Sequence, residues 1–183
     1  MVTAIVVLVI LGLIALVVIG IYNRLVGLRQ NCRQGVADID AQLRQRHDLI
    51  PNLVSTVKGY ASHEKETLDA VISARNTAAA NTNSQTEQQL KLSLDRLLAL
   101  GEAYPDLKAS ANFQSLQGEL ADVEDKLAAA RRALNAAVAQ FNTARDSFPA
   151  VLFAGMFGFG HEDFNRLDPS EKGVVDQVPQ VSF

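Results

Sequence analysis

A cluster of charged and titratable side chains between residues 44 and 48 has the greatest capacity for chemistry in this sequence. Arg44, Arg46, His47 and Asp48 bring together two guanidinium groups, an imidazole and a carboxylate. Such a set forms either a binding site or a structural network of ion pairs. We favour the structural network, because inward-facing charges in helical bundles most often fix the register of packing.

The position of this cluster on its predicted helix explains why it needs partners. Apolar side chains on both sides of it recur every three or four residues, and Arg46 or the adjacent histidine falls where an apolar side chain is due. A charge buried there requires an opposite charge nearby. We expect the partner to be Asp48, Glu119, Glu124 or Asp125.

No other residues form a recognisable catalytic or metal-binding motif. The three histidines, His47, His63 and His161, are not paired as His-Glu-x-x-His, and Cys32 has no second cysteine at a metal-binding interval. The sequence has neither a glycine-rich phosphate loop nor a Gly-x-Ser-x-Gly elbow. We therefore predict a protein that is not an enzyme and that uses no metal or cofactor.

Residues 1–23 are predicted to be a membrane anchor. The first 22 residues carry no charged side chain, and Arg24, Arg29 and Arg33 follow at once. About 20 apolar residues, at ~1.5 Å rise per residue, match the hydrocarbon core of a bilayer. The run is longer than the apolar core of most signal peptides and lacks a small-residue cleavage site, which favours an uncleaved anchor over a cleaved signal or a buried core helix.

The basic residues after the anchor predict its orientation. Lysine and arginine tend to stay on the cytoplasmic side, so the N-terminus is expected outside and the remaining chain inside the cell. The single cysteine suits a reducing compartment. A net charge of −3 provides no basic surface for nucleic acid.

Helical periodicity continues beyond the anchor and predicts an all-α fold. We expect the single transmembrane helix to be followed, over residues 24–148, by an antiparallel up-and-down four-helix bundle with long helices. Pro51 lacks an amide hydrogen, so the chain is expected to reverse or kink sharply within residues 48–52, which would place the first two cytosolic helices side by side. The second of these helices should end near Ala80.

Turn-forming residues delimit the last two predicted helices. The polar segment 81–87 is expected to be a loop, with Thr86 capping the helix that follows. The fourth helix should begin near Asp106. Its apolar residues from Phe113 to Phe148 are spaced three and four apart without a slip, which is typical of a coiled-coil-like seam.

Two further features suggest contacts outside the bundle. Residues 149–183 comprise an uncharged apolar segment, 149–160, and an irregular tail. The segment is too short to span a bilayer as a helix, so it either caps the core or contacts the membrane interface or another subunit. The expected contact residues are Phe153, Met156, Phe157 and Phe159. Gly20 and Gly27 lie one heptad apart and would allow close approach of a second helix.

Long stretches of the chain resemble the LemA family. They read IDAQLRQRHDLIPNLVSTVKGYASHEKETLDAVISAR (39–75), YPDLKASANFQSLQGEL (104–120) and AARRALNAAVAQFNTARDSFP (129–149). The FGF motif at 157–159 and the terminal Val-x-Phe fit as well. One departure is Ala133-Leu134, where the family often has a tyrosine before Asn135.

The resemblance implies a bacterial inner-membrane protein with a cytosolic helical bundle, and it provides no catalytic residues. We interpret the protein as a non-enzymatic scaffold that self-assembles and organises the membrane or envelope proteins. The alternative is a sensor or adaptor whose bundle binds a membrane protease or signalling partner. The expected partners are the lipid bilayer, further copies of the chain and other envelope membrane proteins, but no nucleic acid.

Overall fold

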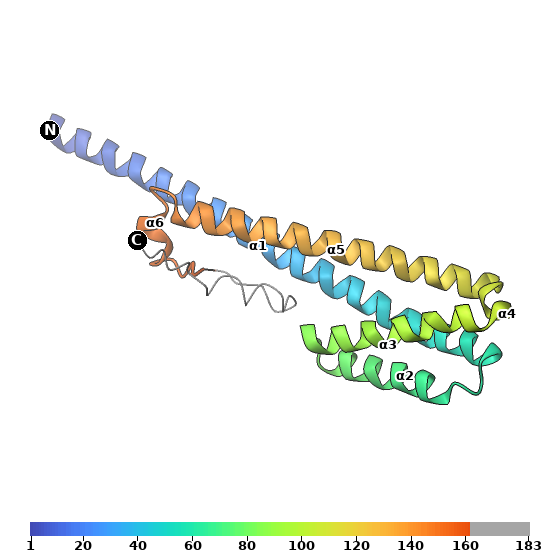
Figure 1. Ribbon diagram of the computed structural model, residues 1–183. Helices are drawn as coiled ribbons and strands as arrows, with labels where there is room; N and C mark the ends of the chain where they lie inside the picture. The colour runs from blue at the N-terminus through green and yellow to red at the C-terminus, as the bar shows by residue number, and fades with distance from the viewer. Residues whose placement is uncertain (162–183) are drawn as a thin grey trace, which may run out of the picture. The chain divides into compact units, whose positions relative to one another are not determined.

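The computed structural model describes residues 1–161, and this part of the chain consists of helices without a strand (Figure 1). The helices are α1 (Val2–Tyr60), α2 (Lys65–Ala80), α3 (Ser84–Ala103), α4 (Pro105–Lys108), α5 (Ala111–Asp146) and α6 (Val151–Ala154). The all-helical prediction is confirmed for these residues. The predicted irregular tail lies outside the described residues from residue 162 onward.

The described residues form two compact units. One contains residues 1–39 and 129–161, and the other contains residues 40–128. Both α1 and α5 contribute to each unit. The sequence analysis divided the chain differently, into an anchor that ends at residue 23, a bundle that ends at residue 148 and a tail. That division, which follows the expected surroundings of each part, stays a prediction.

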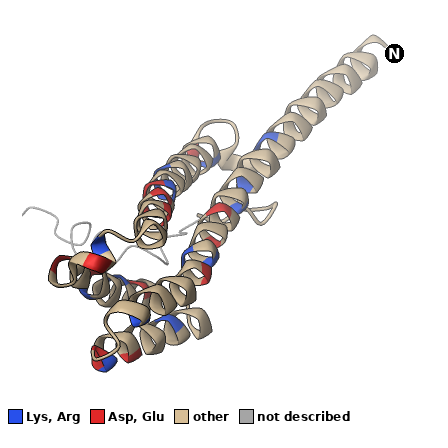
Figure 2. Ribbon diagram, turned by 90° about the vertical axis from the view of Figure 1, so that its right-hand side faces the viewer, with Lys and Arg blue, Asp and Glu red and all other residues tan. Residues whose placement is uncertain are grey.

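The N-terminal part of α1 is apolar and uncovered. Among the described helices, α1 is the one long and apolar enough to cross a membrane, and none of its apolar window is buried. Figure 2 shows charged residues along the other helices and the later part of α1, but none on this stretch. A helix that is apolar on all sides is suited to lipid rather than to water.

In the first unit, α1 and α5 approach each other closely. Leu25, Cys32 and Ile39 are buried along α1, and Leu134 is buried on α5. A Cβ atom added at Gly35 would lie 3.1 Å from Leu134 Cδ1 and 3.2 Å from Leu134 Cα. A side chain at this position would require Leu134 to shift by a few tenths of an ångström, so Gly35 suits the close approach of α1 and α5.

The second unit has a hydrophobic core to which α1, α2, α3, α4 and α5 contribute. Its buried members include Ile50, Leu53, Val57, Leu68, Val71, Leu90, Leu94, Leu97, Leu107, Phe113 and Leu120. Burial of each such side chain stabilises the unit by about 1.5–3 kcal/mol relative to exposure. This burial holds together helices that would be marginal in isolation.

A capping box begins α3 earlier than the sequence predicted. The Asn83 side chain accepts hydrogen bonds from the backbone N–H groups of Gln85 and Thr86 at 2.9 and 3.0 Å. The Thr86 hydroxyl accepts a bond from the Asn83 N–H at 3.1 Å. The predicted loop over residues 81–87 is therefore too long, and Asn83 rather than Thr86 is the N-cap.

The predicted fourth helix is divided in two. The short helix α4 covers the position near Asp106 where that helix was expected to begin, and α5 starts only at Ala111. Pro105 occupies the first turn of α4, where its missing amide hydrogen costs little. Before it, the Tyr104 hydroxyl donates a hydrogen bond to Glu64 Oε1 at 2.9 Å, and this bond raises the pKa of Tyr104.

The predicted reversal at Pro51 is wrong. Helix α1 runs through residues 48–52 without a restart and ends at Tyr60. The chain first turns in the connection at residues 61–64, ahead of α2. The helices that were expected to meet across Pro51 are thus parts of one helix.

Two features retain the helix across Pro51. Proline cannot donate to the carbonyl of His47, four residues earlier. The structure supplies another donor, because Nε of Arg75 on α2 lies 3.3 Å from the His47 carbonyl oxygen. The buried face of α1 also keeps its three-or-four spacing across the proline, through Leu43, Arg46, Ile50, Leu53 and Val57. The helix therefore continues in register with its core.

We expect Pro51→Ala to stabilise the protein, because alanine can donate its own amide hydrogen to the His47 carbonyl. The gain has an upper limit of ~3 kcal/mol, the cost of proline relative to alanine in a helix interior. Thermal unfolding of the full chain in detergent, followed by circular dichroism, measures the change. Pro105→Ala, at a position that tolerates proline, is the control and should change little. A less stable Pro51→Ala variant would contradict this account.

Candidate functional site

A buried network of ion pairs in the second unit joins α1, α3 and α5. The Arg46 residue is only 2% exposed, and its Nη2 donates to Glu87 Oε2 on α3. Its Nη1 donates to Glu124 Oε1 on α5 at 2.6 Å. His47 Nε2 lies 3.0 Å from the other oxygen of Glu87, Oε1. A single carboxylate thus holds two adjacent side chains of α1.

The sequence predicted part of this network. It predicted that Arg46 or His47 faces inward, and the structure buries both. Glu124 is among the expected partners, and the structure places it on Arg46. The sequence analysis did not predict Glu87 as a partner of Arg46, because residue 87 was assigned to a loop. The pattern that could have identified it is the three-or-four spacing of the buried residues of α3, which extends from Leu97 through Leu94 and Leu90 back to Glu87.

The surroundings of Glu87 favour its charged form. Burial by itself would raise the pKa of this carboxyl group. The hydrogen bond to His47 and the attraction of Arg46 together outweigh burial and hold the pKa of Glu87 below its ordinary value of 4.5. The carboxylate is therefore ionised at neutral pH, and its attraction offsets the cost of removing the Arg46 charge from water.

Three members of the predicted cluster line a pocket of about 520 Å³ in the same unit. Its lining residues are Asp40, Leu43, Arg44, His47, Asp48, Arg75, Ala79 and Thr82. Arg44 Nε donates to the Asp40 carbonyl at 3.3 Å, and Arg75 Nε donates to that of His47. Two arginines and two aspartates balance in charge, and both guanidinium groups already have backbone partners. The two arginines and two aspartates of the lining therefore leave it without a strong net charge, and the choice between a structural cluster and a binding site stays a prediction.

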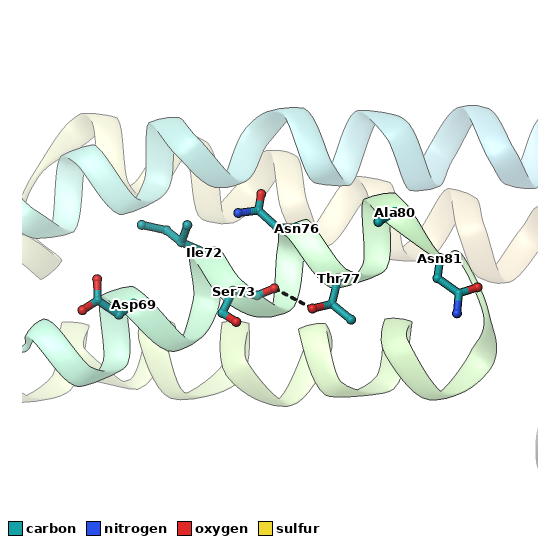
Figure 3. A pocket seen from close by; sticks show the side chains of 7 residues that line it. All are labelled: Asp69, Ile72, Ser73, Asn76, Thr77, Ala80 and Asn81. Carbon is teal, nitrogen blue, oxygen red and sulfur yellow. Dashed lines mark hydrogen bonds between the residues drawn. The ribbon is translucent and has the colours of Figure 1, made fainter.

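A second pocket, of about 630 Å³, lies along α2 (Figure 3). Its lining residues, Asp69, Ile72, Ser73, Asn76, Thr77, Ala80 and Asn81, all come from α2 and its C-terminal end. Asp69 is the one charged group in this lining, and it has no second titratable side chain there to act with. Across residues 1–161, no group of three or more His, Cys, Asp or Glu side chains is placed to hold a metal ion.

In the first unit, the segment after α5 folds back against α1. The ring centroids of Tyr22 and Phe157 are 5.4 Å apart, and those of Tyr22 and Phe159 are 5.5 Å apart. The Phe159 ring is 6.3 Å from that of Phe141 on α5, and its carbonyl accepts a bond from Arg145 Nε at 2.8 Å. These contacts attach the segment to α1 where the apolar stretch ends.

The predicted contact residues of this segment have different environments. Phe159 is buried at 3% exposure and Phe153 is half-buried, whereas Met156 is 83% exposed and Phe157 is 42% exposed. Phe159 caps the interior of the unit, whereas Met156 and Phe157 are exposed. A contact of these exposed residues with the membrane or another subunit stays a prediction.

The two glycines of the predicted helix contact lie on an open face of α1. Gly20 and Gly27 are exposed, and a Cβ atom added at either position would meet nothing within 4 Å. The described chain leaves room for a second helix here. The close approach of another copy stays a prediction.

Comparisons with known proteins identify relatives for most of the chain. A family model described as the LemA family matches residues 35–183. The magnetosome protein MamQ of Magnetospirillum gryphiswaldense is 22% identical over 179 residues, covering 81% of this chain and 66% of MamQ. Protein LemA of Metamycoplasma hominis is 26% identical over 138 residues, covering 73% of this chain and 63% of that protein. The chain thus spans less than two thirds of each relative's length.

We expect Glu87→Gln to lower the free energy of unfolding, because Arg46 then stays buried with one carboxylate fewer. Removing one partner of a buried ion pair costs roughly 3–5 kcal/mol. Urea denaturation at neutral pH measures the loss. Glu102→Gln is the control: its pair with Lys108, at 2.9 Å, is exposed and should contribute less than about 1 kcal/mol. Similar small losses in both variants would contradict a structural role for the network.

The stabilisation from Glu87 should disappear in acid. Because the folded-state pKa of Glu87 lies below 4.5, the unfolded chain binds more protons between the two values. The contribution is therefore fully present above pH 4.5 and is lost as the pH falls through the lowered folded-state pKa. Denaturation curves of wild type and Glu87→Gln should converge in that range. A difference that stays constant down to the acid limit would assign the effect to another group.

Proposed function

The chain belongs to the LemA family, and we propose that it is a non-enzymatic scaffold anchored in the bacterial inner membrane. The scaffold self-assembles and organises the membrane or its envelope proteins. The observation that carries this proposal is the uncovered apolar stretch of α1, together with the open glycine face at its end. An exposed apolar surface of this size requires lipid or another protein to cover it.

We propose that α1 crosses the bilayer once, with its N-terminus outside and the remaining helices in the cytoplasm. Arg24, Arg29 and Arg33 after the apolar stretch support this orientation. We also propose an antiparallel up-and-down four-helix bundle built from α1, α2, α3 and α5. Their contributions to a common core and the short connection between α2 and α3 support that arrangement.

The buried network supports a structural role over a catalytic one. Each of its carboxylates is engaged by Arg46, and the imidazole of His47 is engaged by Glu87. The buried members Arg46, His47 and Glu87 are engaged with one another, and such paired groups fix the positions of helices. This arrangement is suited to a protein whose surfaces must keep a constant shape.

Replacing both Gly20 and Gly27 with leucine should reduce the size of the detergent-extracted particle. Each leucine fits within one chain, because its site is open, but it stands on the face where a second helix would approach. Gly12→Leu is the matched control. The site of Gly12 in the same helix is equally open. At ~100° per residue, Gly12 lies about 80° around the helix from Gly20, so it stands on a different face. Electron microscopy and light scattering measure the particles, with helix content checked by circular dichroism.

A large regular wild-type particle that shrinks only in the double variant supports the scaffold. Unchanged particles would contradict the glycine contact. If the wild-type protein is extracted as a monomer, or only in complex with a different protein, self-assembly is wrong. That result would favour the sensor or adaptor that binds a membrane protease or signalling partner.

A further inference from the structure

An exposed apolar surface lies between the end of α5 and residue 160. Residues 147–160 contain no charged side chain. Phe148, Val151, Leu152, Met156 and Phe157 are all large, apolar and at least 42% exposed. Such a concentration differs from the single apolar residues scattered over the surface of most soluble proteins. We refer to these five side chains as the apolar foot.

The foot is held where the apolar stretch of α1 ends. Tyr22 follows that stretch directly, and its ring lies against Phe157 and Phe159. Figure 1 shows α6 beside the N-terminal part of α1. Tyrosine is enriched at the boundary between hydrocarbon and water, where its ring and hydroxyl meet different surroundings. A bilayer crossed by α1 therefore reaches its interface at the level of the foot.

We propose that the apolar foot is immersed in the interfacial layer of the bilayer and forms a second lipid contact beside the anchor. Fourteen residues are too few to cross the hydrocarbon core as a helix, so the segment lies along the interface. The exposed cations Arg24 and Arg33 follow on α1, where anionic headgroups would attract them. Apolar side chains with cations beside them match the acyl chains and anionic headgroups of a lipid surface. A second copy of the foot would match only the apolar side chains.

The inference rests on the membrane anchoring in the proposed function, but not on self-assembly.

The segment contains two kinds of residue, those that are buried in the unit and those that are exposed. Phe159 and Ala154 are buried and hold the segment on its unit. Phe157 contacts Tyr22 with its ring and remains 42% exposed, and the other four side chains of the foot are at least half exposed, so they can enter lipid without disturbing that packing.

Tryptophan substitution tests the proposal directly, because the chain contains no tryptophan. Leu152→Trp and Met156→Trp place a single reporter in the foot of the full-length protein. The protein is reconstituted in nanodiscs that hold one copy, made of phosphatidylcholine and phosphatidylglycerol with or without brominated acyl chains. Loss of tryptophan emission in the brominated discs reports contact with lipid. Circular dichroism confirms that each variant is folded.

Two controls bracket the measurement. Val9→Trp, in the apolar stretch of α1, reports whether the anchor is in lipid. Leu92→Trp is matched to Leu152→Trp, because both leucines are exposed, at 55% and 59% respectively. We expect brominated lipid to quench Val9→Trp and both foot variants, and to leave Leu92→Trp unaffected.

The alternative outcomes are distinct. Foot reporters that emit like tryptophan in water and are quenched by iodide, while Val9→Trp is quenched by lipid, would overturn the foot and leave the anchor intact. Reporters shielded from iodide only in discs with several copies would replace lipid with a second chain as the partner. An unquenched Val9→Trp would overturn the membrane anchoring itself, and the foot with it.

Discussion

The charge on Arg46 constrains the second unit more than any other single group. A guanidinium group cannot leave water without partners, so α3 and α5 must present Glu87 and Glu124 at the level of this residue. An apolar contact would tolerate a small slide of one helix along another, whereas two ion pairs on one side chain do not. The bond from Arg75 to the His47 carbonyl adds α2 to the same short stretch of α1. Four helices thus take their register from two adjacent residues.

Helical periodicity in the sequence was sufficient to predict an all-helical chain and the inward position of this charge, but not every helix boundary. Periodicity did not predict that the helix continues through Pro51, because helix propensity accounts only for the hydrogen bond that proline removes. The compensating donor, Arg75, belongs to a different helix, and no local pattern links the two residues. The same limit applied at residues 81–87. Their polar composition indicated a loop, yet Asn83 and Thr86 use those polar groups to cap α3, and Glu87 is already an inward-facing helical residue.

The segment after α5 could not be divided from its sequence alone. Its glycines and aromatic residues follow no helical or strand period, so composition shows that the segment is apolar but not which side chains pack. The structure resolves this through aromatic contacts. Phe159 lies between Tyr22 and Phe141 and is buried, whereas Met156, three positions earlier, extends away from the unit. Side chains with similar hydrophobicity therefore serve different purposes within one short segment.

The distribution of exposure along α1 gives the strongest argument about what the protein does. Before Tyr22 the helix is apolar on every side and uncovered, and after it one face is buried while most charged side chains of the helix are exposed. A helix changes character in this way when its surroundings change from lipid to water. In the buried network, Glu87 is engaged by both Arg46 and His47, and Glu124 is engaged by Arg46 through one carboxylate oxygen. The surfaces with unmet physical requirements are instead the apolar stretch, the open glycine face and the exposed side chains beside Tyr22. Each of these requirements is met by lipid or by another helix, and this is the physical basis on which we propose a role at the membrane.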